Sequence, residues 1–255
     1  MSMFDLTGKT AVIVGGTSTL GSAMAMGLAK QGATIALVGR NLEKASEVEQ
    51  KIKTFGVEVR TFQADVTDDR ALKSAADEIV AWADSCDILL NAPGVNSTTP
   101  FSELTMDEWD HIMNVNLKGV VLSCQIFSKH MIEQGNGGSI INISSVSSTT
   151  PLSKVFTYSA SKAGINSITQ YLAREFAPYN IRVNAVIPGF FPAEQNRKIL
   201  SEDRVAAIMR HTPMERFGDP EELQGVAIWL ASKKASSFVT GELIRVDGGF
   251  GAMTI

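Results

Sequence analysis

Short runs of β-branched and other apolar residues alternate along the chain with longer segments of helical periodicity. Strands that alternate with helices of ten or more residues need right-handed crossovers and therefore build a mostly parallel sheet. The pattern predicts a single-domain, doubly wound α/β sheet of about seven mostly parallel strands, with helices on both faces. The predicted strands cover residues 9–14, 34–38, 58–62, 87–90, 139–143, 181–187 and 242–246.

Helical periodicity predicts helices over 22–31, 42–54, 68–84, 106–133 and 157–177. The helix over 106–133 contains Asn114 and Asn116 near its middle. Asparagine is unfavourable inside a helix because its amide competes with the backbone for hydrogen bonds. That cost indicates a functional role for at least one of the two.

Several residues suited to ligand binding follow the predicted strands directly. In open α/β sheets, ligands bind beyond the carboxyl ends of the strands. The sequence therefore predicts a ligand site at this edge of the sheet. The residues placed there are Gly15, Gly39, Asp65, Asn91, Ser145 and Pro188.

A glycine-rich turn, Gly15 to Gly21, joins the first predicted strand to the first helix. Such a unit places backbone N–H groups at a helix N-terminus, where they bind a pyrophosphate. Gly15 permits the tight turn, and Gly21 permits close approach of the helix to the strand. A glycine-rich turn alone is often only a turn, but its position after the first strand indicates a Rossmann-type nucleotide site.

The second strand ends in Gly39 and Arg40, without a carboxylate. An acidic residue here would bind the adenosine ribose hydroxyls, whereas an arginine pairs with a 2′-phosphate. The sequence therefore favours NADP(H) over NAD(H), and the alternative is that Arg40 is a solvated loop charge. Asp65, after the third strand, is placed to accept the adenine amino group.

Tyr158 and Lys162 lie four residues apart, on the same face of the helix predicted over 157–177. An ammonium beside a phenol stabilises the phenolate and lowers its pKa towards a range useful for acid–base catalysis. Ser145, at the end of the strand over 139–143, could reach the same reacting oxygen. The alternative is that this common spacing arises by chance.

Composition narrows the function classes. The chain has 255 residues, 44% hydrophobic and 20% charged, with a net charge of -4. These values fit one large α/β domain or two small ones, and show no basic footprint for nucleic acid or anionic membranes. No linker or repeat divides the chain, so one domain over 1–255 is expected.

The chain shows no signal-peptide pattern and no apolar run of the ~18 residues that a membrane span needs. Cys86 and Cys124 make no disulfide framework and suggest a reducing compartment. His111, His130 and His211 have no metal-ligand spacing. We therefore expect a cytoplasmic protein without a metal site.

Over essentially its whole length the chain resembles the short-chain dehydrogenase/reductase family. The motifs that carry the resemblance are Gly15-x5-Gly21, Asn91-Ala92-x-Gly94, Asn116, Ser145-x12-Tyr158-x3-Lys162 and Pro188-Gly189. The resemblance implies hydride transfer between a nicotinamide cofactor and a small carbonyl or alcohol substrate. The cofactor contacts it implies are Gly15, Thr17, Ser18, Thr19, Leu20, Gly21, Arg40, Asp65, Val66, Asn91, Ala92, Gly94, Tyr158, Lys162, Pro188 and Gly189.

The resemblance also implies catalytic roles. Tyr158 would donate or accept the proton of the substrate oxygen, and Ser145 would orient and polarise that oxygen. Lys162 would bind the nicotinamide ribose and lower the pKa of Tyr158, and Asn116 would extend the proton relay through water. Asn91 would mainly hold the central strands together. A homotetramer, or a homodimer, is implied as well.

The chain departs from the usual family pattern at a few positions. The glycine turn has Val14 and Thr19 where the family usually has a threonine and a further glycine, and Thr19 alters backbone freedom near the phosphates. Pro93 interrupts the Asn-Ala-Gly motif, which is a common variation. Ala193 stands where family members often carry a threonine that contacts the carboxamide.

The segment 188–197 is similar to the corresponding loop of the D-mannonate oxidoreductase (fructuronate reductase) branch. Within a substrate lid expected around 189–215, Gln195, Asn196 and Arg197 supply amides and a guanidinium, which suit hydroxyls and a carboxylate. The sequence therefore favours a sugar acid or polyol as substrate. The alternative for this polar run is the solvated first turn of a lid helix.

Two other functions stay open. One is reduction of a 3-oxoacyl thioester on acyl carrier protein, and the other is nucleotide sensing without catalysis. The apolar C-terminal end, from Phe250, is expected in a subunit interface, and folding back onto its own subunit is the alternative.

Overall fold

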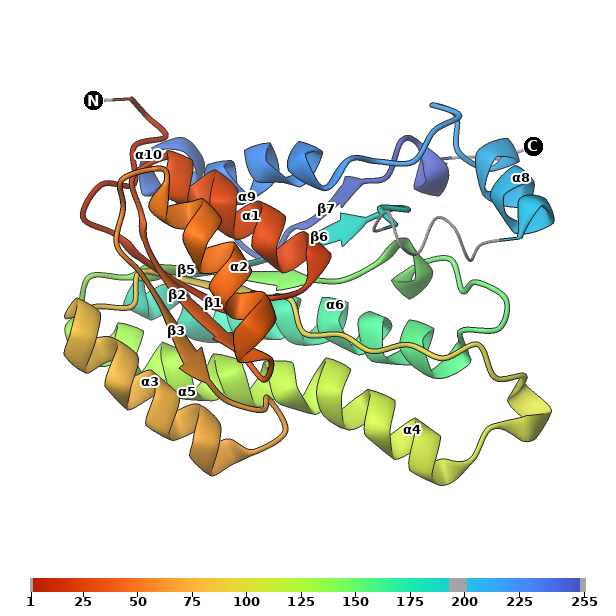
Figure 1. Cartoon of the computed structure of the whole chain (residues 1–255), viewed down its shortest axis with the longest axis horizontal. Helices are drawn as coiled ribbons and strands as arrows, with labels where there is room; N and C mark the ends of the chain where they lie inside the picture. The colour runs from red at the N-terminus through yellow and green to blue at the C-terminus, as the bar shows by residue number, and fades with distance from the viewer. Residues whose placement is uncertain (1, 193–200, 253–255) are drawn as a thin grey trace.

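A computed structural model of the protein describes residues 2–192 and 201–252. The described residues form a seven-stranded sheet in the order β3-β2-β1-β4-β5-β6-β7, and each neighbouring pair in it is parallel (Figure 1). This confirms the predicted doubly wound α/β sheet. The strands are β1 (Thr10–Val14), β2 (Thr34–Gly39), β3 (Val59–Gln63), β4 (Ile88–Asn91), β5 (Gly138–Ile143), β6 (Ile181–Pro188) and β7 (Leu243–Val246).

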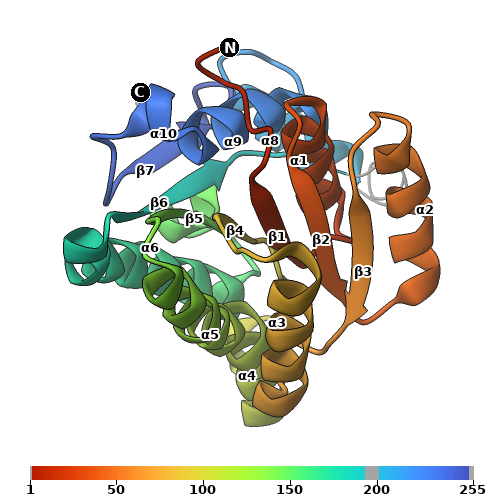
Figure 2. The same ribbon diagram turned by 90° about the vertical axis from the view of Figure 1, so that its left-hand side faces the viewer.

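Helices cover both faces of the sheet, as Figure 2 shows. On one face α1 packs against α2 and α9; on the other, α3 packs against α5 and α4 against α6. The helices are α1 (Thr19–Lys30), α2 (Leu42–Lys53), α3 (Asp69–Ala83), α4 (Met106–Met113), α5 (Gly119–Gln134), α6 (Phe156–Phe176), α8 (Glu202–Arg210), α9 (Gln224–Ala231) and α10 (Lys233–Ser236).

The central strands are largely apolar and buried along their length because both of their faces are covered. In β1, Ala11 and Ile13 join the core beneath α1, while Val12 and Val14 join the core beneath α3 and α5. Successive side chains of a strand point to opposite faces, so this alternation links two separate cores through one strand. The sheet edge that carries the candidate site is thereby held rigidly.

The helix predicted over 106–133 is not one continuous α-helix. The π-helical segment η2 (Asn114–Lys118) separates α4 from α5, and it includes both of the asparagines that the sequence singled out. Single-turn π-helical insertions are frequent at functional sites. Within this segment, the Asn116 amide binds a loop outside the helix, as described below.

Two other details differ from the sequence prediction. Helix α1 begins at Thr19 rather than Ser22, because the Ser18 hydroxyl caps it by accepting a hydrogen bond from Gly21 N. The sequence pattern assigned no element to residues 201–236, where the structure has α8, α9 and α10. Among the described residues, no helix is long and apolar enough to cross a membrane. Short 3-10 helices complete the described part: η1 (Phe101–Glu103), η3 (Val146–Ser148), η4 (Ala177–Tyr179), η5 (Pro220–Leu223) and η6 (Phe250–Ala252).

Candidate active site

The glycine turn after β1 brings the N-terminus of α1 against the end of β4. Gly15 has a φ of 78°, and a Cβ there would lie 2.7 Å from the backbone carbon of Ala92. A Cβ on Gly21 would lie 2.5 Å from the Gly15 oxygen. Neither position accepts a side chain without backbone movement. Because the first amides of a helix lack intrahelical acceptors, those of Thr19 and Leu20 are suited to an anion.

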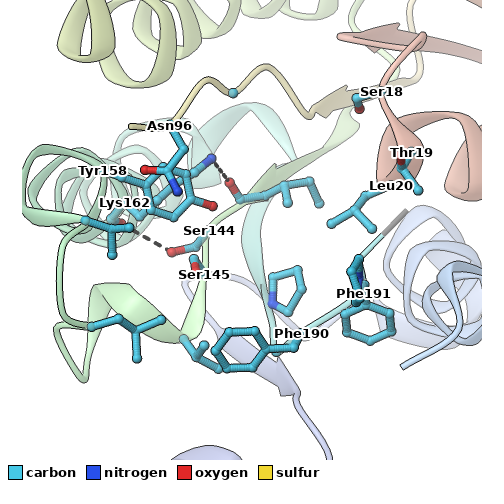
Figure 3. A pocket seen from close by; sticks show the side chains of 18 of the residues that line it. Ser18, Thr19, Leu20, Asn96, Ser144, Ser145, Tyr158, Lys162, Phe190 and Phe191 are labelled. Atoms are coloured by element: carbon cyan, nitrogen blue, oxygen red, sulfur yellow. Dashed lines mark hydrogen bonds between the residues drawn. The ribbon is translucent and has the colours of Figure 1, made fainter. Parts of the chain in front are cut away.

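A cleft of ≈ 780 Å³ opens beside this turn, at the carboxyl edge of the sheet. Figure 3 shows Ser18, Thr19 and Leu20 on one side of it and Ser145, Tyr158 and Lys162 on the other. Ser145 follows β5, whereas Tyr158 and Lys162 lie on α6. The structure thus brings together three predicted catalytic side chains from two segments and places them opposite the glycine turn.

A second cleft, of ≈ 360 Å³, lies around the end of β2. Thr17, Arg40, Lys44 and Asp65 line it, and the turn 92–95 lines both clefts. An elongated ligand can therefore extend from the β2 end to Tyr158 along one edge of the sheet. This shape and the Gly15 cradle fit a dinucleotide whose pyrophosphate lies at the N-terminus of α1.

Most of the predicted cofactor residues line one cleft or both, and two do not. Gly21 packs against the turn, and Asn91 is buried inside the sheet. The residues that line a cleft are Gly15, Thr17, Ser18, Thr19, Leu20, Arg40, Asp65, Val66, Ala92, Gly94, Tyr158, Lys162, Pro188 and Gly189.

Asn91 holds the central strands together. Its Nδ2 donates to Asn142 Oδ1 at 2.9 Å across the β4–β5 pair, and its Oδ1 accepts from Ser123 Oγ at 2.6 Å. Asn142 Nδ2 donates in turn to Thr169 Oγ1 at 2.9 Å on α6. All four side chains are fully buried, so each hydrogen bond satisfies a group that would be costly to leave unpaired. This chain fixes the position of α6 along β5.

At the other end of the edge, Arg40 Nη1 lies 3.4 Å from Asp65 Oδ2. The second oxygen of Asp65 accepts hydrogen bonds from the backbone and hydroxyl of Thr67. Partial burial would raise the pKa of Asp65, but the Thr67 hydrogen bonds and the Arg40 charge outweigh it and hold the pKa below its ordinary value. Asp65 is therefore ionised, and it positions the guanidinium beside the β2 end.

Lys162 is only 3% exposed, and its Nζ donates to the Ile143 carbonyl at 2.8 Å. Burial lowers the pKa of Lys162 to about 8. Burial also raises the pKa of Tyr158, and the neighbouring Ser145 hydroxyl acts in the opposite direction. The predicted lowering of the Tyr158 pKa by Lys162 stays a prediction: Nζ lies 5.7 Å from the ring centroid, and burial of the phenol has the largest influence on its pKa.

The buried ammonium makes stability depend on pH. Between pH 8 and 10.5 the unfolded chain keeps the Lys162 proton that the folded chain has released, so the free energy of unfolding rises with pH. Across this window we expect the free energy of unfolding of the wild-type protein to rise by up to ~3 kcal/mol relative to that of Lys162→Met. Urea unfolding of both proteins at pH 8 and at pH 10.5 measures this gain. A difference that does not change with pH would show that the ammonium is solvated in the folded chain.

Ser145 is held in an extended conformation just after β5, with φ -165° and ψ 154°. Its Oγ accepts hydrogen bonds from Ser147 N at 3.2 Å and Ser147 Oγ at 3.1 Å. The neighbouring Ser144 Oγ donates to the Lys162 carbonyl at 3.2 Å. These bonds tie the β5 end to α6, so the Ser145 hydroxyl and the Tyr158 phenol belong to one rigid unit.

Asn116 is fully buried behind the cleft and does not line it. Its side chain binds Val95 twice, accepting from the backbone N–H at 2.8 Å and donating to the carbonyl at 2.9 Å. It also donates to Ser161 Oγ at 3.1 Å. Asn116 thus fixes the turn after β4 to α6, and its predicted part in a proton relay stays a prediction.

The cleft lining also includes Asn96, Phe190, Phe191, Arg204 and Ile208. The last four lie within the lid expected around 189–215, but the sequence singled out none of the five as a contact, because they come from loops and from α8 and reach the cleft only through tertiary packing. The predicted substrate residues Gln195, Asn196 and Arg197 lie outside the described residues, as does Ala193. Among the described residues, no group of three or more histidine, cysteine or acidic side chains is placed to hold a metal.

The apolar end of the chain folds back onto its own subunit as far as Phe250. That residue is 6% exposed, with its ring centroid 5.3 Å from that of Phe190 and 5.1 Å from that of His211. Phe250 is therefore packed within its own subunit, whereas the interface expected for the apolar end that follows it stays a prediction. Residues 253–255 lie outside the described part.

Most of the chain is similar to known proteins. A family model described as enoyl-(acyl carrier protein) reductase matches residues 14–251. The 2-dehydro-3-deoxy-D-gluconate 5-dehydrogenase of Escherichia coli (strain K12) is 38% identical over 251 residues, covering 98% of each chain.

Two solved structures extend the match to three dimensions. A gluconate 5-dehydrogenase from Burkholderia cenocepacia J2315, in complex with NADP and tartrate, is 35% identical with a TM-score of 0.93, covering 99% of this chain and 98% of that one. A candidate D-mannonate oxidoreductase from Haemophilus influenzae with bound NAD is 33% identical with a TM-score of 0.92, covering 98% and 97%.

Proposed function

The chain belongs to the short-chain dehydrogenase/reductase family and is an oxidoreductase, and from this premise we propose that it interconverts a secondary hydroxyl and a ketone of a sugar acid or polyol. The observation that carries the proposal is the cleft in which Ser145, Tyr158 and Lys162 face the N-terminus of α1. Its companion cleft at the end of β2 suits the adenosine half of a dinucleotide.

The bound nicotinamide cofactor supplies or accepts the hydride. The residues of this chain supply the proton transfer, the hydrogen bonds and the orientation of the reacting groups. The phenol of Tyr158 passes a proton to or from the substrate oxygen, and the Ser145 hydroxyl donates a hydrogen bond to it. Lys162 holds its ammonium between the Ile143 carbonyl and the cleft, where it can bind a ribose hydroxyl. The rigid contact between the β5 end and α6 keeps these groups in a fixed orientation.

Relatives and cleft chemistry support the sugar-acid substrate. The E. coli relative is named for a deoxygluconate derivative, and the B. cenocepacia structure contains tartrate, a hydroxylated dicarboxylate. In the cleft, Asn96 and Arg204 supply polar groups that suit hydroxyls and a carboxylate. The apolar side chains of Leu152, Phe190 and Ile208 also line it, and they favour a second candidate, reduction of a 3-oxoacyl thioester.

The cofactor preference rests on the end of β2. Gly39 and Arg40 provide no carboxylate to exclude a 2′-phosphate, and Lys44 lines the same cleft as a second cation. One related structure contains NADP and another NAD. We therefore propose that this chain prefers NADP(H), on the strength of its own residues.

A kinetic panel with the purified chain tests both proposals. D-Gluconate, D-mannonate, their polyols and acetoacetyl thioesters are each assayed with the phosphorylated and the unphosphorylated cofactor. We expect the highest kcat/KM with a sugar acid and NADP⁺, and NADPH binding at least ~10-fold tighter than NADH because one ion pair is gained. Turnover confined to thioesters would replace the substrate proposal. Cofactor binding without turnover on any member would support nucleotide sensing, and preference for NADH would overturn the role of Arg40.

We also propose a cytoplasmic homotetramer in which residues 189–215 cover the substrate. The buried free thiols of Cys86 and Cys124 fit a reducing compartment. Phe101 and Phe156 are 72% and 47% exposed beside one another, which supports a contact with another subunit. Arg204 and Ile208 already line the cleft, which supports a covering role for their segment. Light scattering of the same preparation should give the mass of four chains, and a monomer would refute the assembly.

A further inference from the structure

The described lining of the substrate cleft carries few charged side chains. Its described lining contains no aspartate or glutamate, and its cations are Lys162 and Arg204. The Lys162 ammonium is deeply buried and already bonded to the Ile143 carbonyl. Arg204 is therefore the cation in this lining that remains for a charged part of the substrate.

Arg204 is held in place from two sides. It lies on α8 four residues before Ile208, so both side chains belong to the face of the helix that lines the cleft. Its Nη1 donates to Ser153 Oγ at 2.9 Å, across to the loop that precedes α6. Among the described residues no carboxylate pairs with it. The guanidinium is thus oriented, while most of its five donors stay available.

The apolar surroundings of Arg204 strengthen the interaction of its guanidinium with an anion. Arg204 is half-buried, and Ile208, Leu152 and Val155 are apolar side chains of the same wall. A charge beside such a wall interacts more strongly than one in open water. A guanidinium binds a carboxylate through two parallel hydrogen bonds, which fixes the orientation of the bound group.

We propose that Arg204 is the specificity-determining residue that binds the carboxylate of the sugar-acid substrate, on the side of the cleft formed by α8. This assignment rests on the proposed function and deepens it. Ser153 acts as a positioning residue that holds the guanidinium towards the cleft. The carboxylate, bound at one end of the substrate, then places a hydroxyl-bearing carbon near Tyr158 and Ser145.

The test compares substrates that differ only in the carboxylate. D-Gluconate and D-glucitol differ at C1 alone, as do D-mannonate and D-mannitol. We expect Arg204→Gln to lower kcat/KM for the better acid by ~10- to 100-fold, mainly through KM, because charge-assisted hydrogen bonds are lost. The same variant should change kcat/KM for the matching polyol by less than about threefold. Arg204→Lys should retain part of the preference, since it keeps the charge without the bidentate geometry.

Two control variants isolate the effect. Arg210 lies on the same helix, is exposed and does not line the cleft. Arg210→Gln should therefore leave kcat/KM unchanged for both substrates. Ser153→Ala keeps the guanidinium but frees it, and should raise KM for the acid by only a few fold.

The outcomes that overturn the assignment are distinct. If Arg204→Gln lowered kcat/KM equally for the acid and the polyol, the residue would only support the cleft wall. If kcat/KM for the acid did not change, the carboxylate would bind elsewhere. Failure of the proposed function appears earlier, in the wild-type protein: if it reduces thioesters but oxidises none of the four compounds, the function is wrong, and the carboxylate assignment falls with it.

Discussion

Replacing Tyr158 with phenylalanine should lower kcat by at least ~100-fold while leaving cofactor affinity within about threefold, because general acid–base catalysis contributes roughly two to four decades of rate. The ring keeps its place between α6 and the cleft, and only the hydroxyl is removed. Because the pKa of Tyr158 is raised by burial, the phenol is protonated at neutral pH. It is then in the state that can donate to a ketone oxygen.

Steady-state kinetics and fluorescence titration of the reduced cofactor separate the two effects. Tyr171→Phe is the matched control, since Tyr171 lies on the same helix and is 66% exposed; it should retain full activity. If Tyr158→Phe keeps near-full kcat, the phenol does not carry the proton, and another group in the cleft must do so.

The sheet could be predicted from the sequence because its central strands are buried on both faces. Short apolar runs such as residues 11–14 are typical of such strands. The same reasoning placed Gly15, Ser145 and Pro188 at one edge, since parallel strands end together. What positions these residues is also partly visible in the sequence: Asn116 lies inside a predicted helix, where its amide is costly without a partner. The structural role of Asn91 was implied by the family resemblance.

Other features depend on tertiary contacts that no local pattern carries. Arg204 becomes a cleft residue only because α8 packs across from the Ser153 loop, a contact that the sequence of α8 does not reveal. The direction of the Tyr158 pKa shift could not be predicted from its spacing to Lys162, because that shift depends first on burial of the phenol. The contact of Asn116 with Val95, made from within the π-helical segment, is likewise a tertiary contact.

Removing the Ser145 hydroxyl should cost ~100- to 1000-fold in kcat, the usual loss for one donor to a developing oxyanion. A weakened local turn would also lower kcat, because Ser145 Oγ accepts two hydrogen bonds from Ser147. Ser145→Ala removes both roles at once. Ser145→Thr keeps the hydroxyl, and its extended backbone tolerates a β-branched residue.

We therefore expect Ser145→Thr to recover at least about a tenth of wild-type kcat while Ser145→Ala does not. Ser147→Ala, which deletes one of the two donors to Ser145 but leaves its hydroxyl, should lower kcat by only a few fold. Thermal unfolding of the three variants shows how much the local turn has weakened. If Ser147→Ala lost as much kcat as Ser145→Ala, the turn rather than the hydroxyl would support catalysis. A loss below about fivefold in Ser145→Ala itself would place the reacting oxygen out of its reach.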